Sequence, residues 1–380
     1  MDYERRCSGL HEQMGLHGLG LVVYGPCPSC QYLIGLPLGW RSEVDAHAAS
    51  ACVFVPRGGP PVLLLPEAWS DLAGQTRIRD VRLVAEGADL AAIVRRLLDD
   101  LGPTEGKIAV GGRVSDLVAA CLMPSAGGEP PCQADGLMDA LRMIKDPEEV
   151  ELLRGVARLT DEALQAVIPH IREGVTQGEL EAEVELQARR LGATGVSFPP
   201  AVIFTKSGRE PAPEPFVYPR EKGLVAGTSI AFDIGFVKGG YCSDFGRSLY
   251  FGAAPAHAKG AYQALQQSLV EVVAKMRDGG MRLCELFGAV EAALDRMGYG
   301  DFLRARLPDR VLGHNIGIDV HEDPWLRPES GQPLRANMVM ALEPKLWHSG
   351  EYYLRVEDIV LVEEGRGKFL TNFDREIFEL

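Results

Sequence analysis

The sequence lacks any apolar run near the roughly 20 residues that a helix needs to cross a bilayer. Its first residues, MDYERRCSGLHEQ, also lack the basic start and the apolar stretch of a secretory signal. We therefore expect a cytoplasmic protein with no membrane-spanning segment.

Positive charge is scarce in the chain. There are 39 Lys and Arg residues against 53 Asp and Glu residues, and the formal net charge is −14. Such a charge repels phosphate backbones and anionic lipid, and no run of basic residues offsets it locally. We therefore exclude nucleic acid and membrane surfaces as partners.

The cysteines do not indicate a disulfide framework. Eight of them are scattered through 380 residues, a pattern typical of reduced thiols. Cys27 and Cys30 form a CxxC pair, but no second pair or nearby histidine completes a zinc site. We favour a coincidence of loop sequence over a functional role for this pair.

The length of the chain favours two domains, each large enough to bury its own core. Residues 1–140 contain one clear helical pattern, at 90–101, and several short apolar or β-branched runs. These strand-like runs lie at 20–24, 51–55, 62–65 and 108–111. Their alternation predicts a small α/β domain that ends in a turn-rich stretch.

Residues 141–380 predict a second domain that mixes helices with an antiparallel sheet. Asp146 and Pro147 begin a helix that we expect to reach about residue 171. Thr176 and Glu179 form a capping box for the next helix. Two more helical patterns lie at 257–276 and 282–297, between strand-like segments.

Residues 229–236 (SIAFDIGF) form a strand pattern whose apolar centre is interrupted by Asp233. A buried lone carboxylate is costly and needs a partner. The chain turns at 238–240 and returns, and a simple hairpin centred at 238.5 places Asp244 opposite Asp233. Opposed carboxylates repel, so either the register differs or a cation lies between them.

The C-terminal region repeats this acidic arrangement. Glu343 follows an apolar strand pattern, a turn follows at 348–350, and residues 353–362 return as a strand. The midpoint of Glu343 and Glu357 is 350, so the two glutamates are predicted to lie opposite each other. Two such pairs in one domain favour a shared function over coincidence.

Each acidic pair alone also fits a solvated face, or a structural ion pair with Arg247 or Arg355. Residues 311–324 (VLGHNIGIDVHEDP) favour a cation site over these structural interpretations. They place His314 in an apolar stretch and His321 beside two acids. Four carboxylates and one imidazole carry four negative charges, which two divalent cations would balance. Oxygen-rich ligands favour manganese, cobalt, zinc, magnesium or iron over copper(I).

Several segments of the chain resemble a known family, the metallopeptidases that include methionine aminopeptidases, prolidases and Xaa-Pro aminopeptidases. Those in the second domain are DIGFVKGGYCSD (233–244), LGHNIGIDVHEDP (312–324), MALEPKLW (340–347) and RVEDIVLV (355–362), with LRMIKDPEEV (141–150) similar to the Xaa-Pro branch. YLIGLPLGW (32–40) is similar to the creatinase/prolidase N-terminal domain. The resemblance implies an α+β pita-bread catalytic domain at 141–380, its antiparallel sheet flanked by helices, and a smaller α/β creatinase/prolidase-like domain at 1–140.

The resemblance also implies a ligand set for two divalent ions, with manganese as the first choice. Asp233 would bind one ion, Asp244 and Glu357 would bridge both, and His314 with Glu343 would bind the other. A homodimer is common in such proteins and is expected here.

Further roles follow from the same resemblance. Glu343 would act as the base toward the attacking water, and His321 would hydrogen-bond or protonate the tetrahedral centre. Arg355 would orient the metal ligands without binding the metal itself, or it would form an ordinary cross-strand ion pair.

The chain departs from the family pattern near the predicted site. Phe216 stands where Xaa-Pro members commonly have a histidine, and Arg310 stands where aminopeptidase members often have another. Asn315 and Lys345 stand where glycine is common. These changes leave all five ligands in place, so they bear on substrate choice, and Phe216 is our candidate substrate-binding residue.

We expect hydrolysis of a C–N bond in a dipeptide or short peptide with proline after the scissile bond. One alternative is a small non-peptide amide or a lyase reaction, because creatinase, ectoine hydrolase and certain dimethylsulfoniopropionate lyases use this scaffold. Another is a catalytically silent binding module, whose usual sign would be lost ligands.

Overall fold

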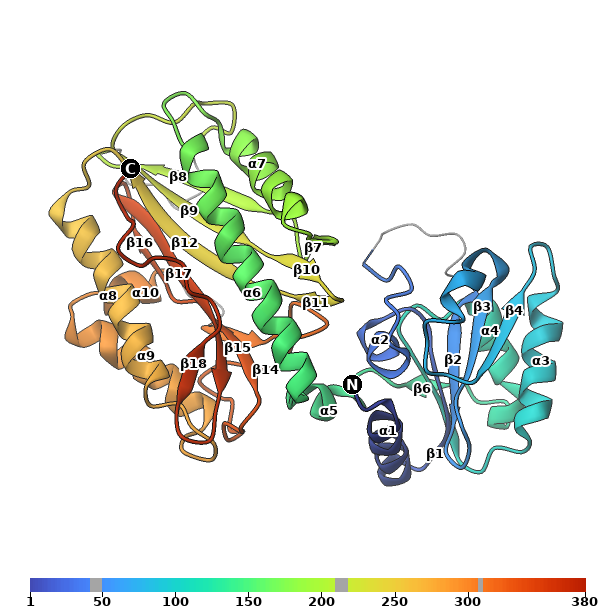
Figure 1. Ribbon diagram of the computed structural model, residues 1–380. Helices are drawn as coiled ribbons and strands as arrows, with labels where there is room; N and C mark the ends of the chain where they lie inside the picture. The colour runs from blue at the N-terminus through green and yellow to red at the C-terminus, as the bar shows by residue number, and fades with distance from the viewer. Residues whose placement is uncertain (42–49, 209–217, 307–309) are drawn as a thin grey trace. The chain divides into compact units, whose positions relative to one another are not determined.

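The computed structural model describes residues 1–41, 50–208, 218–306 and 310–380. The chain divides into two compact units, Met1–Arg142 and Met143–Leu380 (Figure 1). Among the described residues, every helix is too short or too polar to cross a membrane.

The first unit is built on a six-stranded mixed sheet with the strand order β4-β3-β2-β1-β5-β6. Its strands are β1 (Leu19–Tyr24), β2 (Cys52–Pro56), β3 (Val62–Pro66), β4 (Asp80–Val84), β5 (Lys107–Gly111) and β6 (Cys132–Gln133). Its helices are α1 (Tyr3–His17), α2 (Pro28–Ile34), α3 (Leu90–Leu101), α4 (Asp116–Leu122) and α5 (Asp139–Met143), with 3₁₀ turns at Glu67–Leu72 and Pro124–Ala126. The predicted small α/β domain is confirmed.

The CxxC pair has a structural place at the start of α2. Cys27 caps this helix, and its Sγ accepts the backbone amide of Cys30 at 3.3 Å. Burial raises the pKa of Cys27 to about 11, so its thiol stays protonated at neutral pH. All eight cysteines are free thiols.

The second unit contains the four predicted helices. Its helices are α6 (Pro147–Val167), α7 (Gln177–Arg190), α8 (Ala256–Val273), α9 (Leu283–Arg296) and α10 (Gly300–Arg304), with a 3₁₀ turn at Ile168–His170. Helices α6 and α7 begin the unit, and α8 and α9 follow the strands between residues 195 and 251. A capping box starts α7, as predicted, and a second one starts α6 at the predicted Asp146. Helix α6 ends before residue 171, because Pro169 has no amide hydrogen to continue it.

A nine-stranded antiparallel sheet forms the centre of the second unit. The path is β14-β13-β15-β17-β12-β9-β8, and β16 and β18 also pair with β17. A smaller sheet has the order β11-β10-β7. The strands are β7 (Gly195–Val196), β8 (Ala201–Lys206), β9 (Thr228–Ile234), β10 (Phe236–Lys238), β11 (Tyr241–Cys242), β12 (Phe245–Phe251), β13 (Gly313–Asn315), β14 (Glu322–Trp325), β15 (Val339–Leu342), β16 (Lys345–His348), β17 (Tyr352–Val362) and β18 (Gly367–Phe369).

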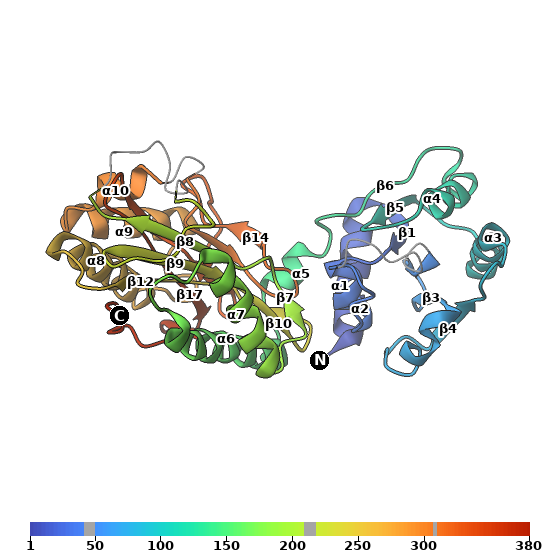
Figure 2. The ribbon, with the colours of Figure 1, turned by 90° about the horizontal axis from the view of Figure 1, so that it is seen from above.

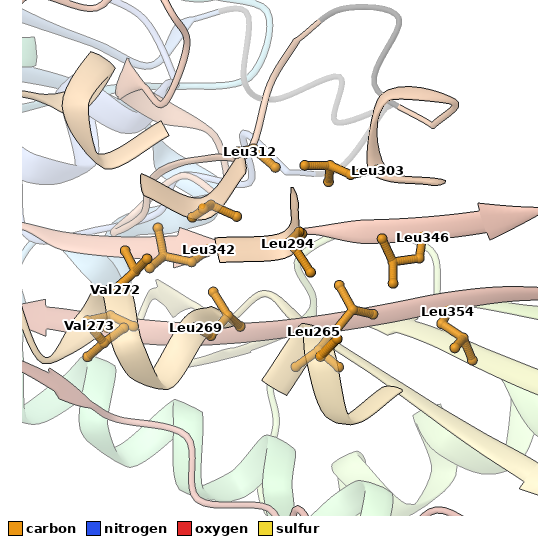
Figure 3. Packing of buried hydrophobic residues seen from close by; sticks show 14 of the residues in the cluster. Leu265, Leu269, Val272, Val273, Leu294, Leu303, Leu312, Leu342, Leu346 and Leu354 are labelled. Carbon is orange, nitrogen blue, oxygen red and sulfur yellow. The ribbon is translucent and has the colours of Figure 1, made fainter. Parts of the chain in front are cut away.

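Two hydrophobic clusters hold the helices against this sheet. Helices α6 and α7 pack on β8, β9 and β12 (Figure 2). Helices α8 and α9 pack on β15, β16 and β17. Figure 3 shows Leu265 of α8 near Leu346 and Leu354 of the strands, and Leu269 of α8 near Leu342. Side chains alternate along a strand, so the residues next to the strand leucines point to the opposite face of the sheet. That face carries the predicted site.

Candidate active site

Glu343 and Glu357 lie opposite each other, as the sequence predicts. On one side of them Leu342 pairs with Asp358, and on the other Lys345 pairs with Arg355. Both pairs have their midpoint at 350, so the same register runs through β15, β16 and β17. Glu357 is fully buried and Glu343 is 8% exposed.

The first acidic hairpin has a different register from the predicted one. Asp233 pairs with Gly246, not with Asp244, so the midpoint of 238.5 is wrong. The reason is the turn: Gly239 and Gly240 have φ angles of 60° and 82°, and they form a tight two-residue turn centred between them. Asp244 lies in the break between β11 and β12.

His314 comes from β13, which lies between β14 and β15 in the sheet. Gly313 makes the pairing with β15 possible, because a Cβ there would collide with the carbonyl oxygen of Ala341. The Nδ1 of His314 lies 3.0 Å from the backbone oxygen of Asn315. A proton on Nδ1 would donate to that oxygen and leave the lone pair of Nε2 free to bind a metal ion. Nε2 lies 3.3 Å from Asp244 Oδ2.

The structure brings the predicted ligands into overlapping groups whose donor atoms lie within 4.8 Å of one another. The groups among the described residues are Asp233, Asp244 and Glu357; His314, Glu343 and Glu357; and Asp244, His314 and His321. Three strands (β9, β13 and β17) and three connections (β11–β12, β13–β14 and β15–β16) therefore converge on one point. The first two groups share Glu357, which suits a bridging carboxylate.

Arg355 lies in the middle of these carboxylates. It donates to Glu357 Oε2 at 2.9 Å, to Glu343 Oε2 at 3.2 Å, and also to Asp233. Gly246 leaves room for it, since a Cβ there would collide with the arginine side chain. Arg247, the other arginine considered as a neutralising partner, instead pairs with Asp358 at 2.8 Å.

Burial and neighbouring charge move the pKa values of these acids in opposite directions. Burial raises the pKa of Asp233 to about 6, although Arg355 opposes the shift. Burial also raises the pKa of Glu357 well above its usual range. For Glu343, burial is outweighed by Lys345 and Arg355, and for Asp244 it is outweighed by His314, so both pKa values are lowered.

The donor set fits divalent metal ions. Two of its carboxylate oxygens, Asp244 Oδ1 and Glu357 Oε1, are buried and have no hydrogen-bond partner in the described part of the chain. A buried oxygen without a partner is costly, and a cation would satisfy it. Carboxylates with one imidazole suit hard or borderline divalent ions.

His321 lies beside this cluster at the wall of a cavity of about 600 Å³. Its ring centre is 4.6 Å from that of His314 and 5.2 Å from that of Trp325. Partial desolvation beside the cluster and the neighbouring His314 lower its pKa. Enough of the residue is exposed for its ring to meet a bound molecule.

The cavity includes residues that we did not predict from the sequence. They are Phe198, Arg306, Val311, Trp325 and Arg327, which come from separate segments. Lys345 also lies here, with its Nζ 2.5 Å from Glu343 Oε2. Spacing could have indicated this contact, because residues two apart on a strand share a face.

Phe216 and Arg310 also depart from the family pattern. Phe216 lies outside the described residues. Arg310 is exposed, and its guanidinium lies 3.9 Å from Glu291 and over the ring of Phe287.

The chain is similar to known proteins. The model of metallopeptidase family M24 matches residues 151–364. A Bacillus subtilis (strain 168) protein named "Putative dipeptidase YkvY" is 28% identical over 260 residues, which are 68% of this chain and 69% of that protein.

Solved structures match over the whole length. A dipeptidase from Pyrococcus horikoshii OT3 has a TM-score of 0.85 and 25% identity, covering 99% of this chain and 100% of that one. A prolidase from Thermococcus sibiricus has a TM-score of 0.84 and 24% identity, with 100% of both chains covered.

The family match spans more than half of the chain and contains every predicted metal ligand. The antiparallel sheet with its flanking helices is the pita-bread fold of that family. The chain therefore belongs to metallopeptidase family M24.

Proposed function

We propose that this protein hydrolyses the peptide bond before proline in dipeptides or short peptides. The observation that carries the proposal is the convergence of four carboxylates and His314 beside a cavity, within the segment that matches the family. Relatives named as a dipeptidase and a prolidase support the substrate class.

We further propose which side chains hold the metal. Asp233 would hold one divalent ion and His314 with Glu343 would hold a second, while Asp244 and Glu357 would contact both. Manganese is the first choice, with cobalt, zinc, iron or magnesium as alternatives. When bound, such ions activate water and polarise a carbonyl group.

Glu343, His321 and Arg355 have separate roles in the proposed hydrolysis. Glu343 accepts a proton from the attacking water, whose oxygen bonds to the carbonyl carbon of the substrate. His321 donates a hydrogen bond to the oxygen that becomes negative. The C–N bond then breaks, and the proline nitrogen leaves with the proton that Glu343 had accepted. Arg355 orients Asp233, Glu343 and Glu357.

The cavity supports a substrate of mixed character. Trp325 and Phe198 offer apolar contact, and Arg306 and Arg327 offer positive charge to a peptide carboxylate. A panel of Xaa-Pro dipeptides, longer Xaa-Pro peptides and small amides tests this proposal. Cleavage of small amides alone would favour the non-peptide alternative, and binding without cleavage would favour a silent module.

We propose a homodimer in a reducing compartment such as the cytoplasm. The free thiols support the compartment, and the family resemblance supports the dimer. Sedimentation of the purified protein tests the second point.

A further inference from the structure

A buried ion pair lies next to His321 and has no part in the chemistry proposed above. Lys145 Nζ is 3.2 Å from Glu322 Oε2, and the two side chains are 1% and 4% exposed. Glu322 directly follows His321 and begins β14, whereas Lys145 directly precedes Asp146, the N-cap of α6. A buried ion pair adds little to stability by itself, because burial removes both charges from water. The pair is better explained by the position that it gives to its neighbours.

The ring of His321 is not held by hydrogen bonds of its own. In the described part of the chain its side chain packs against two rings, those of His314 and Trp325, and has no hydrogen-bond partner. The strand that follows it, β14, lies at the edge of the sheet and pairs with β13 alone. The direction of the ring therefore depends on the backbone that carries it.

The carboxylate of Glu322 organises the turn that leads to His321. Its Oε1 accepts the amide of Asp319 at 3.1 Å, and the carbonyl oxygen of Asp319 accepts the amide of Gly317 at 3.0 Å. Gly317 leaves room for this arrangement, because a Cβ there would lie 2.7 Å from Glu322 Oε2. One carboxylate therefore joins residues 317–322 into a compact turn.

Lys145 holds this carboxylate from a segment that is itself fixed. The backbone amide of Lys145 donates to the carbonyl oxygen of Asn337 at 2.9 Å. The next residue, Asp146, donates its amide to Glu149 in the capping box of α6. Without the ammonium group, Glu322 would be a buried carboxylate that has lost its cation, which is costly. The carboxylate would then move toward water, and the turn that it organises would change.

We propose that Lys145 and Glu322 are positioning residues for His321, an inference that rests on the role of His321 in the proposed function. Lys145 fixes the carboxylate of Glu322, this carboxylate fixes the turn at 317–322, and the turn directs the ring of His321 toward the substrate oxygen. A displacement of about 1 Å at a catalytic group can cost roughly 100-fold in rate. Loss of Lys145 therefore lowers kcat while the metal ligands stay in place.

Double-mutant kinetics of the Mn²⁺-loaded protein on an Xaa-Pro dipeptide test this inference. Lys145→Met should lower kcat by about 10-fold or more, with little change in KM and the same metal content as the wild type. The same substitution in His321→Ala should lower kcat by less than about twofold further, because the ring that it positions is already gone. Lys145→Met combined with Glu322→Gln should recover most of the kcat, because no charge is left buried alone and glutamine keeps the acceptor for the amide of Asp319.

The ring of His321 also reports its own position. In NMR spectra of the full chain with isotope-labelled histidine and no paramagnetic ion, the signal of His321 is the one that is absent from His321→Ala. Lys145→Met should shift or broaden this signal. Lys259→Met is the matched control, because it removes the same charge from an ion pair with Glu379 whose two members do not line the cavity. The control should leave both kcat and the His321 signal as in the wild type.

Thermal unfolding identifies any variant that is not folded. Gly317→Ala then replaces Lys145→Met, because its Cβ would displace the carboxylate of Glu322 without changing any charge. It should lower kcat and alter the His321 signal in the same way.

Wild-type kcat, an unchanged His321 signal or loss of metal in folded Lys145→Met would overturn the positioning role. A full further loss of kcat in the His321→Ala background would also overturn it, because the lysine would then act on the fold as a whole. A wild type that cleaves no Xaa-Pro peptide would instead overturn the proposed function, and the His321 signal would still decide whether Lys145 positions this ring.

Discussion

Glu343 faces Glu357 across two antiparallel strands, and Arg355 donates to both carboxylates. Opposed glutamates in a buried position would destabilise the sheet without positive charge between them. Arg355 supplies one charge, yet Glu357 Oε1 is left without a partner in the described chain. The two glutamates are therefore arranged to bind a cation in addition to the side chain of Arg355.

The double variant Asp244→Asn with Glu357→Gln should lose saturable binding of divalent ions. Both residues offer an unpartnered buried oxygen, and both would contact two ions. Calorimetry on chelated protein measures this. A control with Asp301→Asn and Glu364→Gln makes the same charge change at exposed positions. Wild-type metal binding in the first variant would contradict the ligand assignment.

His321→Ala should keep its metal and lose turnover by about 100-fold or more. Its ring lies beside His314 at the cavity wall, where it can donate to a substrate oxygen. Metal content and kcat measured on the same preparation separate the two roles. A variant with wild-type turnover would show that His321 is only a packing partner of Trp325.

Asp161→Asn should stabilise the protein at pH 8 and leave it unchanged near pH 4. Burial raises the pKa of Asp161 to about 7, above its value in the unfolded chain. Folding therefore favours the protonated form, and stability falls as the pH rises toward 7. Asparagine keeps the acceptor for the amide of Asn372, which lies 2.6 Å away.

Thermal unfolding at both pH values measures this effect, for which we expect an increase in Tm of roughly 3 °C or more at pH 8. Glu162→Gln, at the next and exposed position of α6, is the control. The same Tm gain at both pH values would mean that ionisation of Asp161 is not the cause.

The sequence predicts one of the two acidic hairpins of this site correctly and not the other. The glutamate pair was predictable, because apolar residues flank both acids and the turn between them is short. The partner of Asp233 was not, since its register depends on which residues take positive φ at Gly239 and Gly240. A run of two glycines allows more than one turn.

Other features required the three-dimensional arrangement. Phe198, Arg306 and Trp325 meet around one cavity because the sheet brings distant segments together, and no local pattern indicates that. Which carboxylate Lys345 contacts, Glu343 or another acid, also depends on the pairing of β16 with β17. Strand periodicity predicts only the face on which the lysine lies.

Phe216→His should change the ranking of substrates. Histidine offers a polar, titratable group where phenylalanine offers an apolar face and bulk. We expect the wild type to cleave simple Xaa-Pro dipeptides weakly and to prefer a bulkier or less polar residue before proline, because an unpaired buried polar group costs about 1–3 kcal/mol. Values of kcat/KM for a dipeptide series on both proteins measure this. Vigorous general activity of the wild type, with an unchanged ranking in the variant, would show that Phe216 does not set specificity.

The central claim is that metal ions held by these five residues hydrolyse Xaa-Pro bonds. The most direct measurement is release of proline from Xaa-Pro peptides, with varied first residues, by chelated protein before and after Mn²⁺ is added. We predict no release before addition, release after it, and none at any Mn²⁺ concentration from the variant with Asp244→Asn and Glu357→Gln. Equal release by chelated and reconstituted wild type, or by that variant, would contradict the account.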